Sequence, residues 1–289
     1  MVTRDTVESR VFGTLRWVVI AGLLLVTLFP FYYMVLLSLR PIDKVVSEPG
    51  KLWVAGSELT TSTYRAVLRS VGDGGQGFPQ LLLNSALVSL ATVALTLVIA
   101  IPGSYAVSRL RFVGRRQVHF LFLAVYLFPT ILLAIPLFVL FTRLGLRGSL
   151  GGLVLVYIAQ TIPVSIYMLR NYLTTIPDTL EEAAAVDGAT RLQTIRKIVL
   201  PLAAPALMAN ALYIFMIAWN EFLFALLFLV ERRDRWTVSL GLAQLSGGIE
   251  VSKTTLMAGS VVLTIPIVVL FFAAERMLTE GLTSGAEKG

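Results

Sequence analysis

Apolar residues in this chain occur in six long runs that are separated by polar segments. Each run is long enough to cross roughly 30 Å of hydrocarbon as an α-helix. Five of the runs contain no Asp, Glu, Lys or Arg, and the remaining one, the fifth in chain order, carries a single acid, Glu221. The pattern predicts an all-α membrane protein with six transmembrane helices, at about residues 17–38, 81–108, 119–142, 150–169, 201–230 and 254–274.

Composition agrees with this pattern. Of 289 residues, 56% are apolar and 14% are charged, which is too little charge to cover a soluble domain of this length. The net charge of +7 is explained by basic loops that face an anionic leaflet, so we predict no nucleic-acid partner. The chain has no cysteine and one histidine, His119, which excludes disulfides, cysteine-ligated metals and a multi-histidine site. We therefore predict no metal and no cofactor.

The arginines around the apolar runs predict the orientation. The first run is too long for a signal peptide and no small-residue cleavage site follows it promptly, so we interpret it as an uncleaved span. The loop at 108–118 holds four arginines, whereas the loop at 143–149 holds two. This bias predicts that the 108–118 loop, the 170–200 loop and both termini are cytoplasmic. The resulting cytoplasmic N-terminal segment, transmembrane domain and cytoplasmic C-terminal tail cover residues 1–16, 17–275 and 276–289.

Two polar segments are predicted on the outer face. Residues 39–80 contain Pro49-Gly50 and several further glycines, a composition that favours irregular structure with one short helix at about 61–70. Residues 231–253 form a second, shorter loop on the same face. These segments give the outer surface more polar chain than a set of simple hairpins would.

The cytoplasmic loop after the fourth run has a more specific pattern. Asp178 with Glu181, and Thr190 with Gln193, have the spacing of helix-capping pairs, and Gly188 between them is a helix breaker. We predict two short amphipathic helices joined by a sharp turn. One interpretation is a helix pair that lies in the lipid headgroups. The acidic, alanine-rich first helix has little to attract it to anionic lipid, so we favour a protruding element that docks into a groove on another protein.

The residues of this loop resemble a known motif. Glu182-Ala183-Ala184, Gly188, Ile198 and Leu200-Pro201 have the identities and spacing of the EAA loop of binding-protein-dependent ABC importers, here at 178–200. The run from Glu182 to Thr190 looks like the version in sugar-importer permeases. The C-terminal residues 281–289 are similar to the tail of the maltose-type second permease. The resemblance covers nearly the whole chain, with Thr194-Ile195 standing where many relatives have an aromatic residue.

The resemblance implies a transport machine with several partners. These are a homologous second permease, a cytoplasmic ATPase dimer and an extracytoplasmic solute-binding protein, with membrane lipid around them and a sugar as substrate, in a bacterial or archaeal cytoplasmic membrane. The chain has no G-x-x-x-x-G-K-[ST] phosphate loop, so we predict that it is not an enzyme and has no catalytic residue. Residues implied in ATPase docking are Glu182, Ala183, Ala184, Asp187, Gly188, Ile198, Leu200 and Pro201, and those implied in a tail contact are Gly285, Lys288 and Gly289.

Polar residues inside the apolar runs are candidates for the solute path. Amide and aromatic groups suit sugars, whose hydroxyls form hydrogen bonds and whose apolar faces stack. For each we favour the simpler interpretation, a hydrogen bond between helices. Glu221 lies about 30 Å along the helix from Pro201, which predicts a position near the outer interface. The path candidates are Asn84, Tyr105, Gln160, Tyr213, Trp219 and Asn220.

Three other functions remain open at this point. The first is an ABC importer permease for a non-sugar solute, such as an amino acid, phosphate or a polyamine. The second is an ion-coupled secondary carrier, which would need an acid or cation site at mid-membrane, whereas the centres of the runs carry no charge. The third is a membrane scaffold that transports nothing, against which the docking loop argues.

Overall fold

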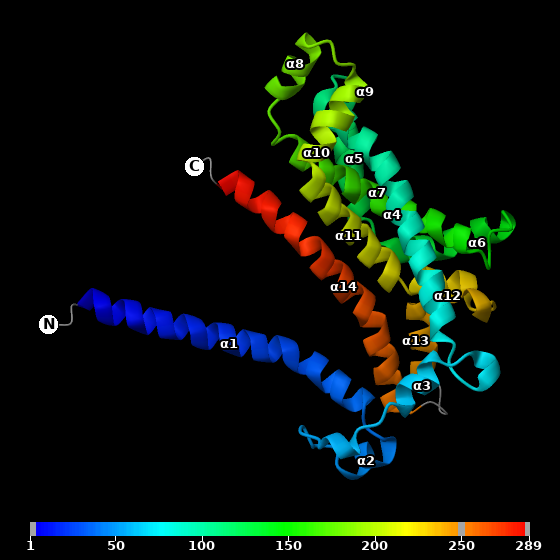
Figure 1. Cartoon of the computed structure of the whole chain (residues 1–289). Helices are drawn as coiled ribbons and strands as arrows, with labels where there is room; N and C mark the ends of the chain where they lie inside the picture. The colour runs from blue at the N-terminus through cyan, green and yellow to red at the C-terminus, as the bar shows by residue number, and fades with distance from the viewer. Residues whose placement is uncertain (1–3, 248–251, 287–289) are drawn as a thin grey trace. The chain divides into compact units, whose positions relative to one another are not determined.

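The computed structural model describes residues 4–247 and 252–286, and within these ranges every regular element is a helix (Figure 1). The all-α class is therefore confirmed. The chain divides into two compact units. The first comprises Met1–Gly77 and Gln244–Val262, and the second comprises Phe78–Ala243 and Leu263–Gly289.

Three long helices form the centre of the second unit. α4 (Phe78–Arg109) packs along α7 (Leu150–Leu173), and α11 (Ala204–Asn220) packs against both (Figure 1). Short polar side chains link them within the apolar interior. The hydroxyls of Thr96 and Thr161 are 2.9 Å apart between α4 and α7. The Asn210 side-chain amide donates to the Ser165 carbonyl at 3.0 Å, which ties α11 to α7.

Among the residues that the structure describes, four helices are long and apolar enough to cross a membrane. They are α1 (Arg4–Ser38), α4, α7 and α14 (Lys253–Ala286), and they coincide with the first, second, fourth and sixth predicted spans. The C-terminal tail expected from residue 276 is not a separate segment as far as Ala286, because α14 continues through it.

The third predicted span is interrupted, so the expectation of one continuous helix at 119–142 is wrong. The chain forms α5 (Arg115–Leu127), a 3₁₀ turn η3 (Thr130–Leu133) and α6 (Ala134–Arg143). Phe128 has an extended backbone, at φ −73° and ψ 127°. Pro129 follows it, and a proline both lacks an N–H donor and disfavours helix in the residue before it. The interruption lies at that proline.

The fifth predicted span is also broken, into α10 (Leu200–Leu202), α11 and α12 (Leu223–Leu229). The helical segment ending at Leu202 meets α11 at an angle of 77°. Pro205 explains this bend, because it has no N–H to donate to the carbonyl four residues earlier and its ring clashes with that carbonyl. A second break follows Asn220, where Glu221 is extended.

The first unit contains α1 and short helices. These are α2 (Ile42–Ser47), the 3₁₀ turns η1 (Gly56–Glu58) and η2 (Val71–Asp73), and α3 (Ser62–Leu68), which confirms the helix predicted near 61–70. Arg40, 1% exposed, organises the segment after α1. Its guanidinium donates to the carbonyls of Lys44 at 3.2 Å and Lys51 at 3.4 Å. This segment is therefore organised by a buried charge.

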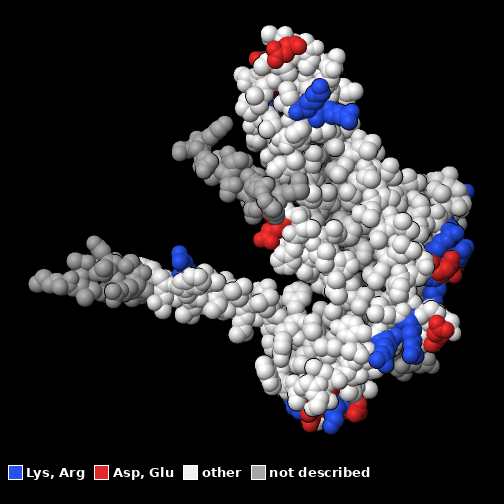
Figure 2. Space-filling model, in the orientation of Figure 1, with Lys and Arg blue, Asp and Glu red and all other residues white. Residues whose placement is uncertain are grey.

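Charged side chains of the second unit gather at its two ends. Figure 2 shows acidic and basic groups over α8 (Thr179–Val186) and α9 (Arg191–Thr194). Others lie over the α6–α7 connection and the turn η5 (Arg233–Arg235), which precedes α13 (Val238–Gly247). The surface between them is largely uncharged. This distribution suits a protein whose middle lies in hydrocarbon.

Candidate functional site

The cytoplasmic loop predicted from the sequence folds as a helical hairpin. α8 (Thr179–Val186) is built on two acids and three alanines, and it ends at Gly188, whose φ is +80°. The Gly188 N–H donates to the Ala185 carbonyl at 3.1 Å, and the Ala189 N–H to the Ala184 carbonyl at 2.9 Å. This pair of bonds is a Schellman motif, which uses a left-handed residue to close a helix. The predicted glycine turn is confirmed.

The second helix of the hairpin begins with a capping box. The Gln193 N–H donates to the Thr190 hydroxyl at 3.4 Å, and the Gln193 side chain accepts from the Thr190 N–H at 2.8 Å. This start of α9 (Arg191–Thr194) is as predicted. The helix then continues through one π-helical turn, η4 (Ile195–Val199), into α10.

The first expected capping pair is absent. Asp178 makes no side-chain cap bond, and it lies instead 2.5 Å from the Arg109 Nη1 atom. Glu181 accepts from Arg109 Nε at 2.7 Å and from the Tyr105 hydroxyl at 2.7 Å. A carboxylate gains more from a charge-assisted bond to a guanidinium than from a neutral backbone N–H. Both acids therefore turn away from their own helix and toward the end of α4.

Arg109 joins these groups into what we call the Arg109 clamp, formed by Arg109, Tyr105, Asp178, Glu181 and the Ile176 carbonyl. Nη2 of Arg109 donates to that carbonyl at 2.8 Å. The side chains of Arg109 and Glu181 are only 11% and 14% exposed. Sequence reasoning counted Arg109 only as a loop charge. The signal it missed is an arginine at the end of an apolar run, opposite the acids that open a later helix.

Beneath the hairpin, apolar side chains pack it onto the transmembrane helices. Ile176 and Val199 pack with Tyr105 of α4, Leu173 of α7 and Ala203 at the bend. Val199 is 1% exposed. The hairpin is thus fixed to the transmembrane helices by polar contacts at one edge and by apolar contacts across its base.

The outward side of the hairpin holds most of the expected docking residues. Among them, Ala184 is buried, and Ile198 and Leu200 are half-buried. Two large apolar side chains, Val186 and Leu192, are 89% and 74% exposed. An apolar surface of this kind on a polar loop is typical of an interaction site. The expected docking residues that lie exposed are Glu182, Ala183, Asp187, Gly188 and Pro201.

Hydrogen bonds within the protein account for the polar groups of Asn84, Tyr105, Trp219 and Asn220. The Asn84 amide donates to the carbonyls of Asp234 at 2.9 Å and Trp236 at 3.0 Å. The Trp219 indole donates to the Leu263 carbonyl, and the Asn220 amide to a carbonyl one turn earlier in its own helix. Tyr105 belongs to the Arg109 clamp. The bonds of Tyr105 and Trp219 join two helices, as the sequence analysis favoured, whereas Asn220 bonds within its own helix and Asn84 bonds to the turn before α13.

Glu221 also has a structural role. It accepts from the Tyr157 hydroxyl at 2.5 Å and from the backbone N–H groups of Phe224 at 2.9 Å and Ala225 at 3.2 Å. A carboxylate in this position caps a helix N-terminus. The acid therefore begins α12 at the point where α11 ends.

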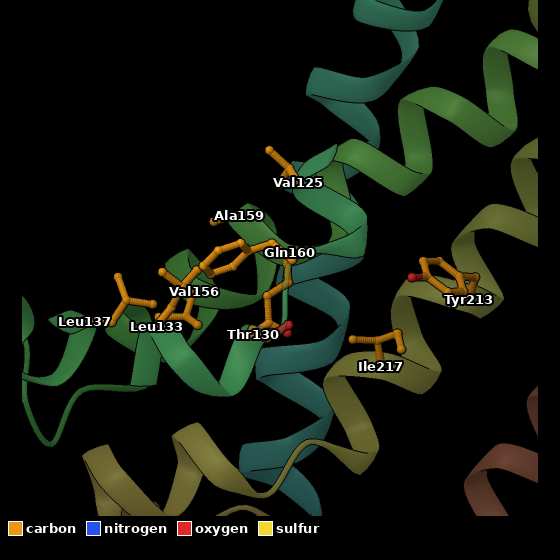
Figure 3. A pocket seen from close by; sticks show the side chains of 10 residues that line it. Val125, Thr130, Leu133, Leu137, Val156, Ala159, Gln160, Tyr213 and Ile217 are labelled. Carbon is orange, nitrogen blue, oxygen red and sulfur yellow. The ribbon is translucent and has the colours of Figure 1, made fainter. Parts of the chain in front are cut away.

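The remaining two candidates, Gln160 and Tyr213, face one cavity of about 260 Å³. Gln160 extends from α7 and Tyr213 from α11 into the same space, with Thr130 of η3 close by (Figure 3). The Nε2 atom of Gln160 is buried and has no hydrogen-bond partner. The cavity is lined by Val125, Phe128, Thr130, Leu133, Leu137, Val156, Ala159, Gln160, Tyr213 and Ile217.

Comparison with known proteins places these features in a family. Residues 93–283 match the model of the inner membrane component of binding-protein-dependent transport systems. The chain belongs to this family. The match covers both the helical hairpin and the cavity. The importer-permease assignment is thereby confirmed, as is a multi-pass membrane protein that acts as a transport subunit rather than an enzyme.

Members of this family with similar sequences include sugar permeases. The chain is 38% identical over 269 residues to a trehalose/maltose transport system permease of Thermococcus litoralis, covering 92% of this chain and 93% of the relative. It is 38% identical over 264 residues to a trehalose transport system permease of Mycobacterium tuberculosis, covering 91% and 93%. An inner membrane ABC transporter permease of Escherichia coli is 36% identical over 270 residues, covering 93% and 94%. The resemblance to sugar-importer permeases is confirmed.

A solved structure shares the fold. A chain in the crystal structure of a bacterial ABC transporter involved in alginate import matches with a TM-score of 0.78. The sequences are 24% identical, and the match covers 95% of this chain and 98% of the other. At this identity the likeness speaks for the fold alone.

Proposed function

We propose that this chain is one of two homologous permeases that form the transmembrane path of an ATP-driven importer for a sugar or oligosaccharide. Family membership supports the permease role, and the names of the trehalose and maltose permeases support the solute class. The observation that carries the proposal is the α8–Gly188–α9 hairpin. It presents an acidic, alanine-rich surface outward while its base is anchored to the transmembrane helices.

In this proposal the hairpin docks into a cleft on the cytoplasmic ATPase. The exposed Val186 and Leu192 supply apolar contact area, and the exposed carboxylates of Glu182 and Asp187 pair with basic groups of the ATPase. Small alanine side chains allow close approach of the helix. The other residues of the proposed docking set are Ala183, Ala184, Gly188, Ile198, Leu200 and Pro201.

The Arg109 clamp then gives the hairpin a route to the transmembrane helices. A displacement of α8 pulls on the end of α4 through Arg109 and Tyr105. At its other end the hairpin continues through α10 into α11 across the 77° bend. ATP-driven closure of the ATPases would therefore move two helices of the path at once, which suits a two-state switch.

The rest of the assembly follows the same proposal. In this proposal the chain crosses the membrane six times with the hairpin and both termini in the cytoplasm, and an extracytoplasmic binding protein delivers the solute to the opposite face. Gly285, at the end of α14, begins a second contact with the ATPase. Lys288 and Gly289, the other residues of that contact, lie outside the described residues.

Uptake by the assembled importer tests this proposal. The chain is co-expressed with the permease, ATPase and binding-protein genes that neighbour it, and uptake of radiolabelled trehalose and maltose is measured with and without ATP. We expect uptake that requires ATP and the binding protein. Uptake driven by an ion gradient without ATP would indicate a secondary carrier, and ATP-driven uptake of amino acids or phosphate alone would contradict the sugar assignment.

A further inference from the structure

The cavity between α7 and α11 combines features that a solute site needs. Its ten lining residues all lie in the described part of the chain, and none of them carries a formal charge at neutral pH. Three of them bring polar groups: the amide of Gln160 and the hydroxyls of Thr130 and Tyr213. Two of them, Phe128 and Tyr213, bring aromatic rings. The rest are apolar. A mostly apolar cavity with a few placed polar groups is the usual form of a small-molecule site.

One polar atom in this cavity is costly as it stands. Nε2 of Gln160 is buried and makes no hydrogen bond. A buried amide donor without an acceptor is unfavourable, and such groups are uncommon in folded proteins. The side chains of Asn84 and Trp219, two other path candidates, donate to carbonyls within the protein. The unpaired donor of Gln160 therefore calls for an acceptor supplied by a molecule in the cavity.

The cavity also lies where it can respond to the hairpin. Tyr213 and Ile217 are on α11, the helix that follows the 77° bend, while Val156 and Gln160 are on α7. A movement of α11 relative to α7 would change the space between these pairs. The shape of a site in this position would therefore change with the conformational switch that drives transport.

We propose that this cavity is a subsite for one uncharged sugar ring, which accepts a hydrogen bond from Gln160 Nε2 and packs against Phe128 and Tyr213. The inference rests on the proposed sugar-import function. It adds where in this chain the sugar binds and that the sugar is uncharged. Sugar hydroxyls supply the missing acceptor, and the apolar face of a pyranose suits aromatic rings. A lipid acyl chain could fill the space but would leave the amide unpaired. An anionic sugar would bury its charge without a counter-charge, which costs far more than burying a hydroxyl.

Because the chain has no cysteine, single introduced cysteines report on chosen positions of this chain alone. Ala159→Cys places a thiol at the cavity wall, and Leu155→Cys places one on the same helix outside the lining. In the intact importer, labelling of each thiol by N-ethylmaleimide is followed by mass spectrometry of this chain. Labelling rates are compared without sugar, with trehalose or maltose, and with a uronic-acid disaccharide.

We expect trehalose or maltose to slow the labelling of Ala159→Cys at least threefold, while the uronic-acid disaccharide has no effect. Leu155→Cys should react at the same rate throughout. Adding Gln160→Leu should weaken protection, with about a threefold to tenfold higher sugar concentration needed, since one neutral hydrogen bond is lost. Thr92→Val removes a buried hydroxyl that bonds only within α4, and it should leave protection unchanged.

Equal labelling with and without both neutral disaccharides would overturn the subsite. So would protection that survives Gln160→Leu, or stronger protection by the acidic disaccharide. The uptake of the same two sugars by the same preparation separates this failure from a failure of the proposed function. Normal ATP-driven uptake without protection contradicts only the subsite, whereas absent uptake of both sugars contradicts the subsite and the sugar function together.

Discussion

A single guanidinium at the end of α4 holds three groups in the α8–α9 hairpin and the turn that precedes it. Arg109 contacts the carboxylates of Asp178 and Glu181 and the carbonyl of Ile176, and two of these three contacts involve charge. Asp178 is 72% exposed, so its pairing adds little, whereas the shielded pair with Glu181 dominates the clamp. Removing the arginine would leave Glu181 with only Tyr105 as its partner outside the hairpin.

Arg109→Gln should uncouple ATP hydrolysis from transport. Loss of a charged partner for a shielded carboxylate costs roughly 1–3 kcal/mol, enough to loosen α8 from α4 without dissolving the hairpin. We expect the ATPase to co-purify and to hydrolyse ATP, while solute transported per ATP falls about tenfold, the change that 1.4 kcal/mol represents. Arg111→Gln, an exposed arginine two residues later, is the control. Normal coupling in Arg109→Gln would show that the clamp transmits nothing.

Gly188 offers a second test, which depends on backbone conformation alone. Its φ of +80° is strained for any residue with a side chain, although a Cβ there would meet no atom within 4 Å. In Gly188→Val the left-handed backbone conformation therefore raises the free energy of the hairpin by roughly 1–2 kcal/mol, and asparagine raises it much less. We expect Gly188→Val to lose most ATPase co-purification and Gly188→Asn to keep it. Equal co-purification of both variants would contradict a docking role for the turn.

The carboxylate of Glu182 tests the charge of the docking surface. It is exposed on α8 and is not part of the Arg109 clamp, so its replacement leaves the hairpin folded. Glu182→Lys should abolish co-purification of the ATPase because it brings like charges together, and Glu182→Gln should weaken it less. Both variants should retain membrane insertion, measured as the amount of chain in the membrane fraction. Unchanged recruitment of the ATPase by Glu182→Lys is the result that would remove this residue from the docking set.

At the scale of elements, the bend before α11 is the joint between the hairpin and the path. Pro205 removes one backbone hydrogen bond at that joint. Pro205→Ala restores the donor and should straighten the helix, so that spin labels at positions 192 and 217 of the cysteine-free chain move apart. Uptake should fall because the hairpin is then aimed differently. Pro266→Ala, within the long helix α14, is the control and should change neither quantity. An unchanged distance in Pro205→Ala would assign the bend to packing instead.

Long elements and the hairpin were predictable from sequence, and the breaks were not. Uncharged runs and capping patterns encode α4, α7 and the start of α9 directly. Eight prolines lie within the apolar runs, yet α4 continues through Pro102 while the chain breaks before Pro129. Which proline is tolerated depends on whether neighbouring helices satisfy the freed carbonyl, and that is a property of packing. The contacts of Asp178 and Glu181 with the end of α4 also depend on how the helices pack, so the sequence did not predict them.

At the scale of the whole molecule, orientation is open to direct test. Leu144→Cys lies in the α6–α7 connection and Arg191→Cys in the hairpin, and both positions are exposed. A membrane-impermeant thiol reagent applied to intact cells should label Leu144→Cys, whereas Arg191→Cys should react only after the membrane is permeabilised. The absence of native cysteines makes the signal specific to these sites. The reverse pattern would place the hairpin outside the cell and contradict ATPase docking.

The interruption at Pro129 has a consequence for the number of times the chain crosses the membrane. The proposed topology puts both termini on one side of the membrane, which requires an even number of crossings, and among the described helices α1, α4, α7, α14 and the bent segment that includes α11 account for up to five. The sixth must then come from α5 and α6, whose lengths of about 20 Å and about 15 Å are each too short for a bilayer alone. The chain would cross once in two halves, with irregular backbone at mid-depth. Such backbone is tolerated where it borders a protein cavity, and Phe128 and Thr130 of this joint line the cavity that holds Gln160.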